Sequence, residues 1–88
     1  MNVALSPQDI AILDLESHFP QHSARKEEEI VTRLDLSAVR YYQLLGRLLD
    51  SPAALAHDPL LVRRLRRLRE VDRARRTRPL PPVRSAIA

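Results

Sequence analysis

The sequence predicts an all-α protein: a small bundle of about four helices with a helix-turn-helix and a basic C-terminal helix. Three observations lead to this fold class. The 88 residues include a single glycine, whereas strand hairpins usually need glycine in their turns. The chain is rich in Leu, Ala and Arg, and its apolar residues recur at helical spacing. Serine or aspartate, often followed by proline, precedes most of these runs, as is typical of helix starts.

The first helix is predicted over residues 7–18, after a flexible N-terminus at residues 1–5. Ser6 can cap it, with Pro7 at the first helical position, and Pro20 prevents the helix from continuing. Its apolar surface is wide, so we expect it to contact more than one other helix. The residues of this surface are Ile12, Leu15 and Phe19, flanked by Ile10 and Leu13.

The second helix is predicted over residues 24–34, with Ser23 as its cap. Its expected apolar face consists of Ile30, Val31 and Leu34. The triplet Glu27–Glu29 could suggest a metal site, but consecutive side chains point about 100° apart on a helix and cannot converge on one ion. We therefore expect a solvated acidic face near the helix N-terminus, where the helix dipole favours acids.

A short turn, Asp35–Ser37, leads to the third predicted helix, which runs to about Asp50. Many helix-turn-helix motifs place a left-handed glycine where this chain has Asp35, and aspartate tolerates that conformation better than most residues. Ser37 is the expected cap. Gly46 is predicted to permit a close approach of another helix. The core face of this helix is expected to contain Tyr41, Leu44, Leu45 and Leu48.

The C-terminal third begins with a short helical turn at residues 52–57, and Asp58 then caps an Arg-rich helix at residues 59–78. Residues 6–58 would thus form the helix-turn-helix core, and the Pro-rich residues 79–88 a disordered tail. The apolar stripe of the Arg-rich helix is expected to dock on the core as far as about Val71. This stripe consists of Leu61, Leu65 and Leu68, with Val62 and Val71 nearby.

The charge is distributed unevenly along the chain. Residues 1–59 carry five basic and nine acidic side chains, a net charge of −4, whereas residues 60–88 carry a net charge of +8. Such a basic segment attracts phosphate through counterion release, and arginine suits bidentate phosphate contacts. An acidic protein or an RNA polymerase surface, an anionic membrane and a solvated tail are the alternatives. The candidate phosphate-binding residues are Tyr42, Arg47, Arg63, Arg64, Arg66, Arg67, Arg69, Arg73, Arg75 and Arg76.

The third helix is the candidate DNA-recognition helix. No acidic residue occurs between Ser37 and Leu49, which suits a helix that enters a groove. Arginine can bind guanine, glutamine can pair with adenine, and small apolar groups can touch the thymine methyl group. The alternative is one helix of a bundle that binds another protein. The candidate base-facing residues are Ser37, Ala38, Val39, Arg40 and Gln43.

No arrangement of residues predicts catalysis, so we expect no enzyme activity, cofactor, metal or small-molecule substrate. The chain lacks cysteine and a Gly-rich phosphate loop, and His18, His22 and His57 are scattered at the ends of predicted elements or between them, without metal-ligand spacing. Its apolar runs are too short for a bilayer span, and its N-terminus lacks the pattern of a secretion signal. We therefore expect a cytoplasmic protein without a membrane partner.

The segments RYYQ and DPLLVRRLRR, within residues 5–70, resemble a family of small, formerly uncharacterised actinobacterial proteins. The resemblance implies a helix-turn-helix fold and, for some relatives, nucleoid association with limited sequence preference. Members tend to have aromatic residues near the end of the first helix, where this chain has His18 and Phe19. The residues that the resemblance singles out are Arg40, Tyr41, Tyr42 and Gln43, together with Arg63, Arg64, Arg66 and Arg67.

The sequence therefore predicts a nucleoid-associated or transcription-regulatory protein that binds double-stranded DNA with limited sequence preference. An 88-residue monomer offers DNA a small footprint, which favours a homodimer or oligomer on DNA. The alternatives are an adaptor that binds the transcription machinery through its basic helix, and a site-specific repressor. Salt dependence and sequence discrimination separate these functions.

Overall fold

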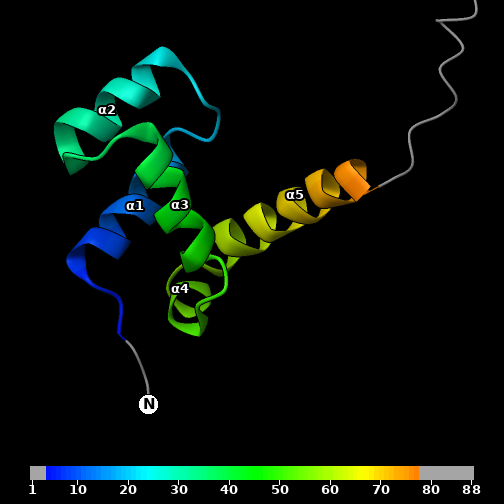
Figure 1. Ribbon diagram of the computed structural model, residues 1–88. Coiled ribbons are helices and arrows are strands. Elements are labelled where there is room, and N and C mark those ends of the chain that lie inside the picture. Colours follow the sequence, from blue (N-terminus) through cyan, green and yellow to red (C-terminus); the bar gives the residue numbers. More distant parts are fainter. Residues whose placement is uncertain (1–3, 78–88) are drawn as a thin grey trace, which may run out of the picture.

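The computed structural model describes residues 4–77, with side chains as far as Arg75. This part of the chain is all-helical and has no strand, which confirms the predicted fold class (Figure 1). The short turn predicted at residues 52–57 is a helix of its own, so the Arg-rich helix is the fifth. Most of the predicted N-terminus and all of the predicted tail at residues 79–88 lie outside the described residues. The helices are α1 (Pro7–His18), α2 (Ala24–Leu34), α3 (Ala38–Leu48), α4 (Pro52–His57) and α5 (Pro59–Thr77).

Every helix begins at a side chain that caps it. In each case a serine hydroxyl or an aspartate carboxylate accepts a hydrogen bond from the backbone N–H three residues later, at 3.0 to 3.3 Å. These local bonds satisfy backbone donors that the helix leaves unpaired, so helix starts depend little on tertiary packing. The caps are Ser6, Ser23, Ser37, Ser51 and Asp58.

Asp35 ends α2 in the left-handed conformation, with φ 57° and ψ 40°. No other non-glycine residue of the described chain has a positive φ. Its backbone N–H donates to the carbonyl oxygen of Val31 at 3.0 Å. Asp35 thus adopts the left-handed conformation that the sequence predicts for it, and Ser37 then caps α3.

The core lies where α1, α2 and α3 pack on one another, and it continues into the contact between α4 and α5. Helix α1 packs on both α2 and α3, as its wide apolar surface predicts. Ile10, at the flank of that surface, is 41% exposed. The buried apolar residues are Ile12, Leu13, Leu15, Ile30, Tyr41, Leu45, Leu48, Leu49, Ala54, Leu61 and Val62.

Three sequence-based expectations about packing are wrong. Val31 is 54% exposed because α2 turns Ile30 into the core and the next side chain points about 100° away. A Cβ atom on Gly46 would meet no neighbouring atom within 4 Å, so this glycine serves no close helix approach among the described residues.

The third correction concerns α5, which docks on the bundle only through its first half. Leu61 and Val62 are buried and Leu65 is partly buried, but Leu68 is 57% exposed and Val71 is 45% exposed. The contact ends near Leu65 and not near Val71, because α5 continues past the edge of the bundle and none of the other four helices lies beneath its distal half (Figure 1).

Candidate nucleic-acid interface

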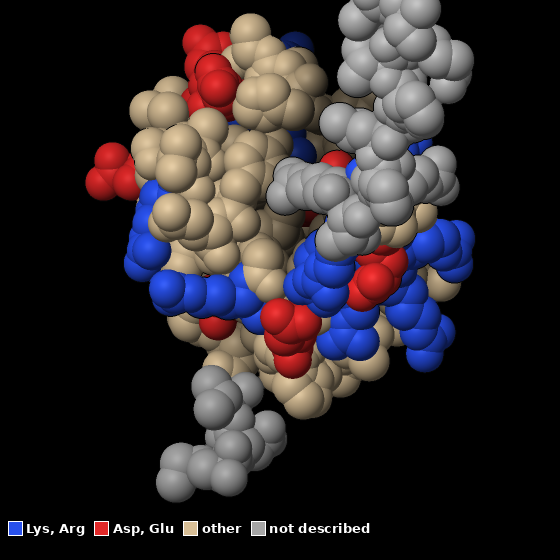
Figure 2. Space-filling view, turned by 45° about the vertical axis from the view of Figure 1, so that its right-hand side comes forward, with Lys and Arg blue, Asp and Glu red and all other residues tan. Residues whose placement is uncertain are grey.

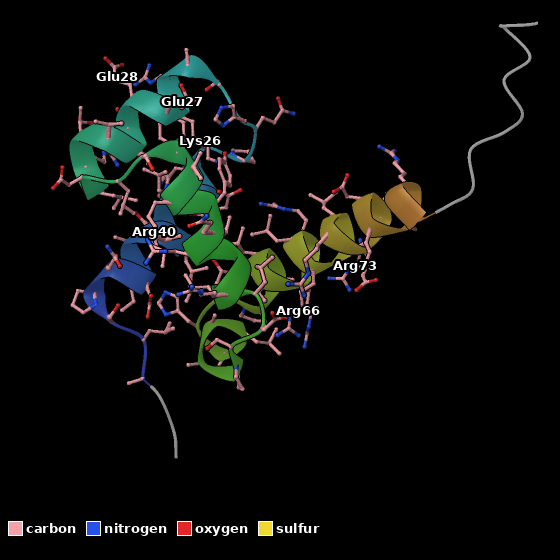
Figure 3. All side chains as sticks on the ribbon, viewed as in Figure 1. Lys26, Glu27, Glu28, Arg40, Arg66 and Arg73 are labelled. Atoms are coloured by element: carbon pink, nitrogen blue, oxygen red, sulfur yellow. The ribbon has the colours of Figure 1, made fainter. Side chains whose placement is uncertain are left out.

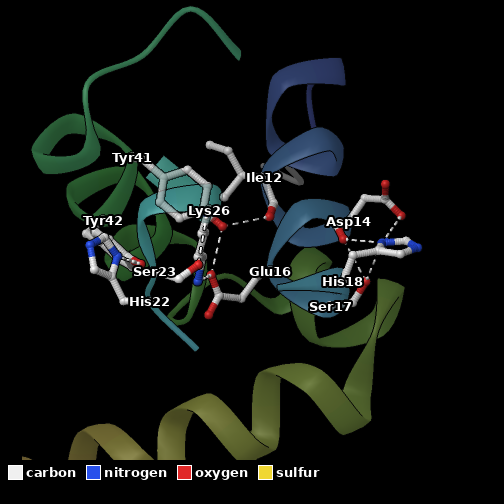
Figure 4. Close-up of polar contacts among 10 residues, drawn as sticks. All are labelled: Ile12, Asp14, Glu16, Ser17, His18, His22, Ser23, Lys26, Tyr41 and Tyr42. Atoms are coloured by element: carbon white, nitrogen blue, oxygen red, sulfur yellow. Dashed lines mark hydrogen bonds and ion pairs between the residues drawn. The ribbon is translucent and has the colours of Figure 1, made fainter. Parts of the chain in front are cut away.

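A buried ion pair joins α1 to α2, and a tyrosine of α3, the candidate recognition helix, binds the same carboxylate (Figure 4). Lys26 Nζ lies 2.7 Å from Glu16 Oε1, and both side chains are almost completely buried. The Tyr41 hydroxyl donates to the same oxygen at 2.7 Å and lies 3.3 Å from the carbonyl oxygen of Ile12. One carboxylate from α1 therefore holds side chains from both α2 and α3.

Burial raises the pKa of Tyr41 far above its ordinary value, and its hydrogen bond to Glu16 and the negative charge of that residue raise it further. The hydroxyl therefore stays protonated and remains a hydrogen-bond donor to the carboxylate. The core position of Tyr41 was predicted from the sequence, but the roles of Glu16 and Lys26 were not. The sequence does contain a signal for this pair. Glu16 follows Ile12 by four residues and Lys26 precedes Ile30 by four, so each charged residue lies on the same side of its helix as a buried isoleucine, and the two charges are opposite.

The candidate base-facing residues divide into two groups. Val39, Arg40 and Gln43 are exposed, with Val39 at 69%, and Arg40 Nη1 lies 3.4 Å from Gln43 Oε1. The Ser37 hydroxyl already accepts the backbone N–H of Arg40 as the cap, and Ala38 is only partly exposed. The outward face of α3 therefore offers few groups that can discriminate between bases.

Tyr42, a candidate phosphate-binding residue, is half-buried and its hydroxyl faces another side chain. The hydroxyl lies 2.8 Å from His22 Nδ1, and His22 Nε2 lies 3.3 Å from Glu27 Oε2. A histidine protonated at Nε2 can donate to Glu27 while accepting from Tyr42. The Tyr42 ring also stands edge-on to the Tyr41 ring, 5.0 Å away at 85°. These contacts connect the loop between α1 and α2 to α3.

A shallow, largely apolar hollow of about 650 Å³ opens between the N-terminal parts of α2 and α3. It brings the acidic side chain of Glu27 next to three of the candidate base-facing residues. The part of α3 that contains no acidic residue therefore lies close to Glu27 of α2. The sequence does not show this proximity, because the two segments are more than ten residues apart. The residues that line this hollow are His22, Glu27, Ala38, Val39, Tyr42 and Gln43.

The arginines of α5 also divide into two groups. Arg66 and Arg69 are partly buried and tie α5 to the end of α3: Arg66 Nε donates to the carbonyl oxygen of Leu49, and Arg69 Nη2 donates to Asp50 Oδ1 at 3.0 Å. Such contacts with the C-terminal end of a helix are favourable for a cation. The Arg76 side chain lies outside the described residues. The exposed group consists of Arg63, Arg64, Arg67, Arg73 and Arg75.

Arginine side chains, in blue, gather where α5 comes forward, at the lower right of the face that Figure 2 shows, with acidic side chains in red among them. The sticks in Figure 3 place Arg66 and Arg73 along α5, whereas Glu27 and Glu28 lie on α2, across the bundle. Arg47, on α3, is exposed as well.

Within residues 4–77, no group of three His, Asp or Glu side chains is placed to hold a metal ion. No helix in the same part of the chain is long and apolar enough to cross a membrane.

Comparison of the sequence with known protein families gives a match. Residues 4–78 match a family model described as "Protein of unknown function (DUF3263)". The match spans the bundle and the whole of α5, so both regions belong to one family unit. The comparisons with curated proteins and with solved structures found no match.

Proposed function

The chain belongs to the DUF3263 family, whose function is unknown, and we propose that it binds double-stranded DNA through the exposed arginines of α5. The observation that carries this proposal is the group of five exposed arginines on one helix, described above. Duplex DNA presents closely spaced phosphates, and each arginine that neutralises one releases a counterion. The protein would act at the chromosome, as a nucleoid-associated or transcription-regulatory factor.

The attachment of α5 to the bundle supports the proposal. Burial of Leu61 and Val62 fixes the first half of α5 on the bundle, and the bonds of Arg66 to Leu49 and of Arg69 to Asp50 add contacts with the end of α3. The exposed arginines are thus presented on an ordered helix, and less conformational entropy is lost when they meet phosphates. Arg66 and Arg69 themselves act in this proposal as positioning residues.

The expected sequence preference is limited. Arg40 and Gln43 are exposed on α3 and can reach base edges, but Glu27 beside the hollow repels phosphates near the N-terminus of that helix. We propose that α3 lies across the major groove with Arg40 and Arg47 near the DNA, while α5 supplies most of the affinity. Few base contacts and many phosphate contacts are typical of proteins that coat DNA.

A salt titration on random and selected duplexes tests this function. Replacing Arg63, Arg64 and Arg67 together by glutamine should weaken binding to all sequences alike. The slope of log Kobs against log salt is negative, and its magnitude should decrease by about 2 to 3, since each lost phosphate contact removes about 0.9. The control is Arg33→Gln, which removes one charge from α2, where Arg33 pairs with Glu29, and should leave the slope unchanged.

The same titration separates the alternatives. Alanine at Arg40 and Gln43 should change the sequence preference more than the overall affinity. A protein that discriminates strongly between duplexes would be a site-specific repressor and not the proposed DNA-coating protein. If the chain does not bind any duplex at low salt, the proposal is wrong, and an adaptor that docks on a protein through α5 becomes the better explanation.

A further inference from the structure

We infer that copies of this chain associate head to tail, with Leu68 and Val71 on α5 of one copy packed into the hollow between α2 and α3 of the next. The inference does not depend on DNA binding, because both surfaces belong to the protein alone. It assigns a partner to two features that the fold leaves unexplained: the exposed apolar residues of α5 and the apolar hollow.

The first surface is the exposed side of the distal half of α5. Leu68 and Val71 are three residues apart, so they lie on one side of the helix, and both are about half exposed. Arg64 and Arg75 flank them on the same side, at positions four residues before Leu68 and four residues after Val71. Arg67 is also exposed beside them. Asp72, four residues after Leu68, is exposed on the same side as well. This surface, the α5 face, thus has an apolar centre and a border of three arginines and one aspartate, with a net positive charge.

The second surface is the hollow, which has the opposite border. Val39 is 69% exposed and, with Ala38 and the Tyr42 ring, forms its apolar wall. Glu27 lines the hollow, and Glu28 is exposed on the same helix. The volume of about 650 Å³ lies within the range of pockets that hold a small molecule, so it can take two aliphatic side chains.

Charge complementarity indicates that the α5 face of a second copy is the occupant of the hollow. The arginines beside Leu68 and Val71 would lie near Glu27 at the border of the hollow, and Glu28 adds negative charge to the same helix, which favours this pairing. Two α5 faces packed on each other would instead place arginines against arginines, and like charges in an interface are costly. Arg40 Nη1 lies 3.4 Å from the Oε1 atom of Gln43, which lines the hollow, and is a basic side chain close to it. The α5 face therefore fits the hollow better than it fits a second α5.

The contact must form between molecules. No α5 residue lines the hollow, and α5 leaves the bundle beside α4, whereas Glu27 and Glu28 lie on α2 across the bundle (Figure 3). An interface between two different surfaces of the same chain is heterologous, and it produces open chains of molecules unless the rotation closes a ring. Only a few apolar side chains are buried, so the association should be weak in free solution.

DNA can strengthen such an association without a new contact. Copies bound to one duplex have a high effective concentration toward one another. Arg63 precedes Leu68 by five residues and points about 140° away from it around the helix axis, so it remains available for phosphate while Leu68 is covered. Arg63 can therefore contact phosphate while the head-to-tail contact is formed, whereas Arg64, Arg67 and Arg75 lie at its border and would be shared between the two contacts.

Sedimentation velocity of the full chain over a wide concentration range, without DNA, tests the inference. The wild type should show a mass that rises with concentration and falls when salt is added. The first variant carries Leu68→Ser and Val71→Ser, and the second carries Glu27→Lys and Glu28→Lys. Each should weaken self-association by at least about tenfold. All four residues are exposed, so the fold should persist, as circular dichroism would verify. The control Leu60→Ser replaces an 80% exposed leucine outside the α5 face and should associate like the wild type.

Mixing the two variants gives the decisive result. The first variant keeps an intact hollow and the second keeps an intact α5 face, so the mixture should form a one-to-one pair that does not grow further. A wild type that stays monomeric at every concentration would overturn the inference. Self-association of the second variant alone, or a mixture without a pair, would also overturn it. None of these results bears on DNA binding, because DNA is absent.

Discussion

The bundle and the distal half of α5 use similar residues for different purposes. In the bundle, aliphatic side chains at helical spacing are buried, and even the charged Lys26 and Glu16 lie inside. In the distal half of α5, Leu68 and Val71 continue the same spacing but remain exposed among arginines. An apolar stripe therefore predicts which side of a helix can be buried, but the length of the neighbouring structure decides how much of it is buried.

The two regions also use their charges differently. The side chains of Lys26 and Glu16 are almost completely shielded from solvent, so each charge depends on the other for its stabilisation. The bond between Arg69 and Asp50 has one partner that is 70% exposed, and it contributes little to stability by itself. The bundle should accordingly be sensitive to single substitutions, whereas distal α5 should tolerate them.

The largest effect is expected from Lys26→Met, which leaves the Glu16 carboxylate buried without its cation. Breaking one partner of a buried pair costs about 3 to 5 kcal/mol, so the free energy of unfolding in urea should fall by that amount. The double variant with Glu16→Gln removes both charges and keeps an acceptor for Tyr41, and it should recover part of the loss. The exposed neighbour Arg25 serves as control, since Arg25→Met should change stability by less than about 0.5 kcal/mol. A small loss for Lys26→Met would contradict the buried pair.

A pair of identical substitutions on α5 tests where its docking ends. Leu61 is 4% exposed, so Leu61→Ala should lower the free energy of unfolding by about 2 to 5 kcal/mol. Leu68 is 57% exposed, so Leu68→Ala in dilute protein should change it by less than about 0.5 kcal/mol. Chemical denaturation of both variants measures the difference. Equal losses would mean that the distal half packs on the bundle.

A smaller and pH-dependent effect is expected from Tyr41→Phe. The variant loses a hydrogen bond to a charged acceptor, which should cost about 1.5 to 3 kcal/mol at neutral pH. In the wild type the pKa of Tyr41 is raised in the folded state, so above pH 10 only the unfolded chain releases this proton. Wild-type stability should then decline by up to about 1.4 kcal/mol per pH unit, a decline that phenylalanine lacks. Urea denaturation from neutral pH to above pH 10 should show the two proteins converging, and parallel curves would refute this role of the hydroxyl.

Local chemistry explains which parts of the fold were predictable. The serine caps, the prolines at first helical positions and the left-handed Asp35 affect only residues close to them in the sequence. The helix boundaries can therefore be predicted from short stretches of sequence. The side of α3 that holds Tyr41 follows from helical spacing in the same way. The exposure of Val31 and the open space beside Gly46 depend on where other helices lie, and no local pattern contains that information.

The sequence by itself determined the all-α class, the helix starts and the concentration of positive charge after Pro59, because these depend on composition and short-range hydrogen bonds. The tertiary structure alone decided that Lys26 meets Glu16 and that Glu27 lies beside Val39. It also decided that Arg66 and Arg69 are tied to α3 while Leu68 is left exposed. The physical reason is the same in each case: burial and charge pairing depend on distances between helices, which the folded packing of the whole chain sets.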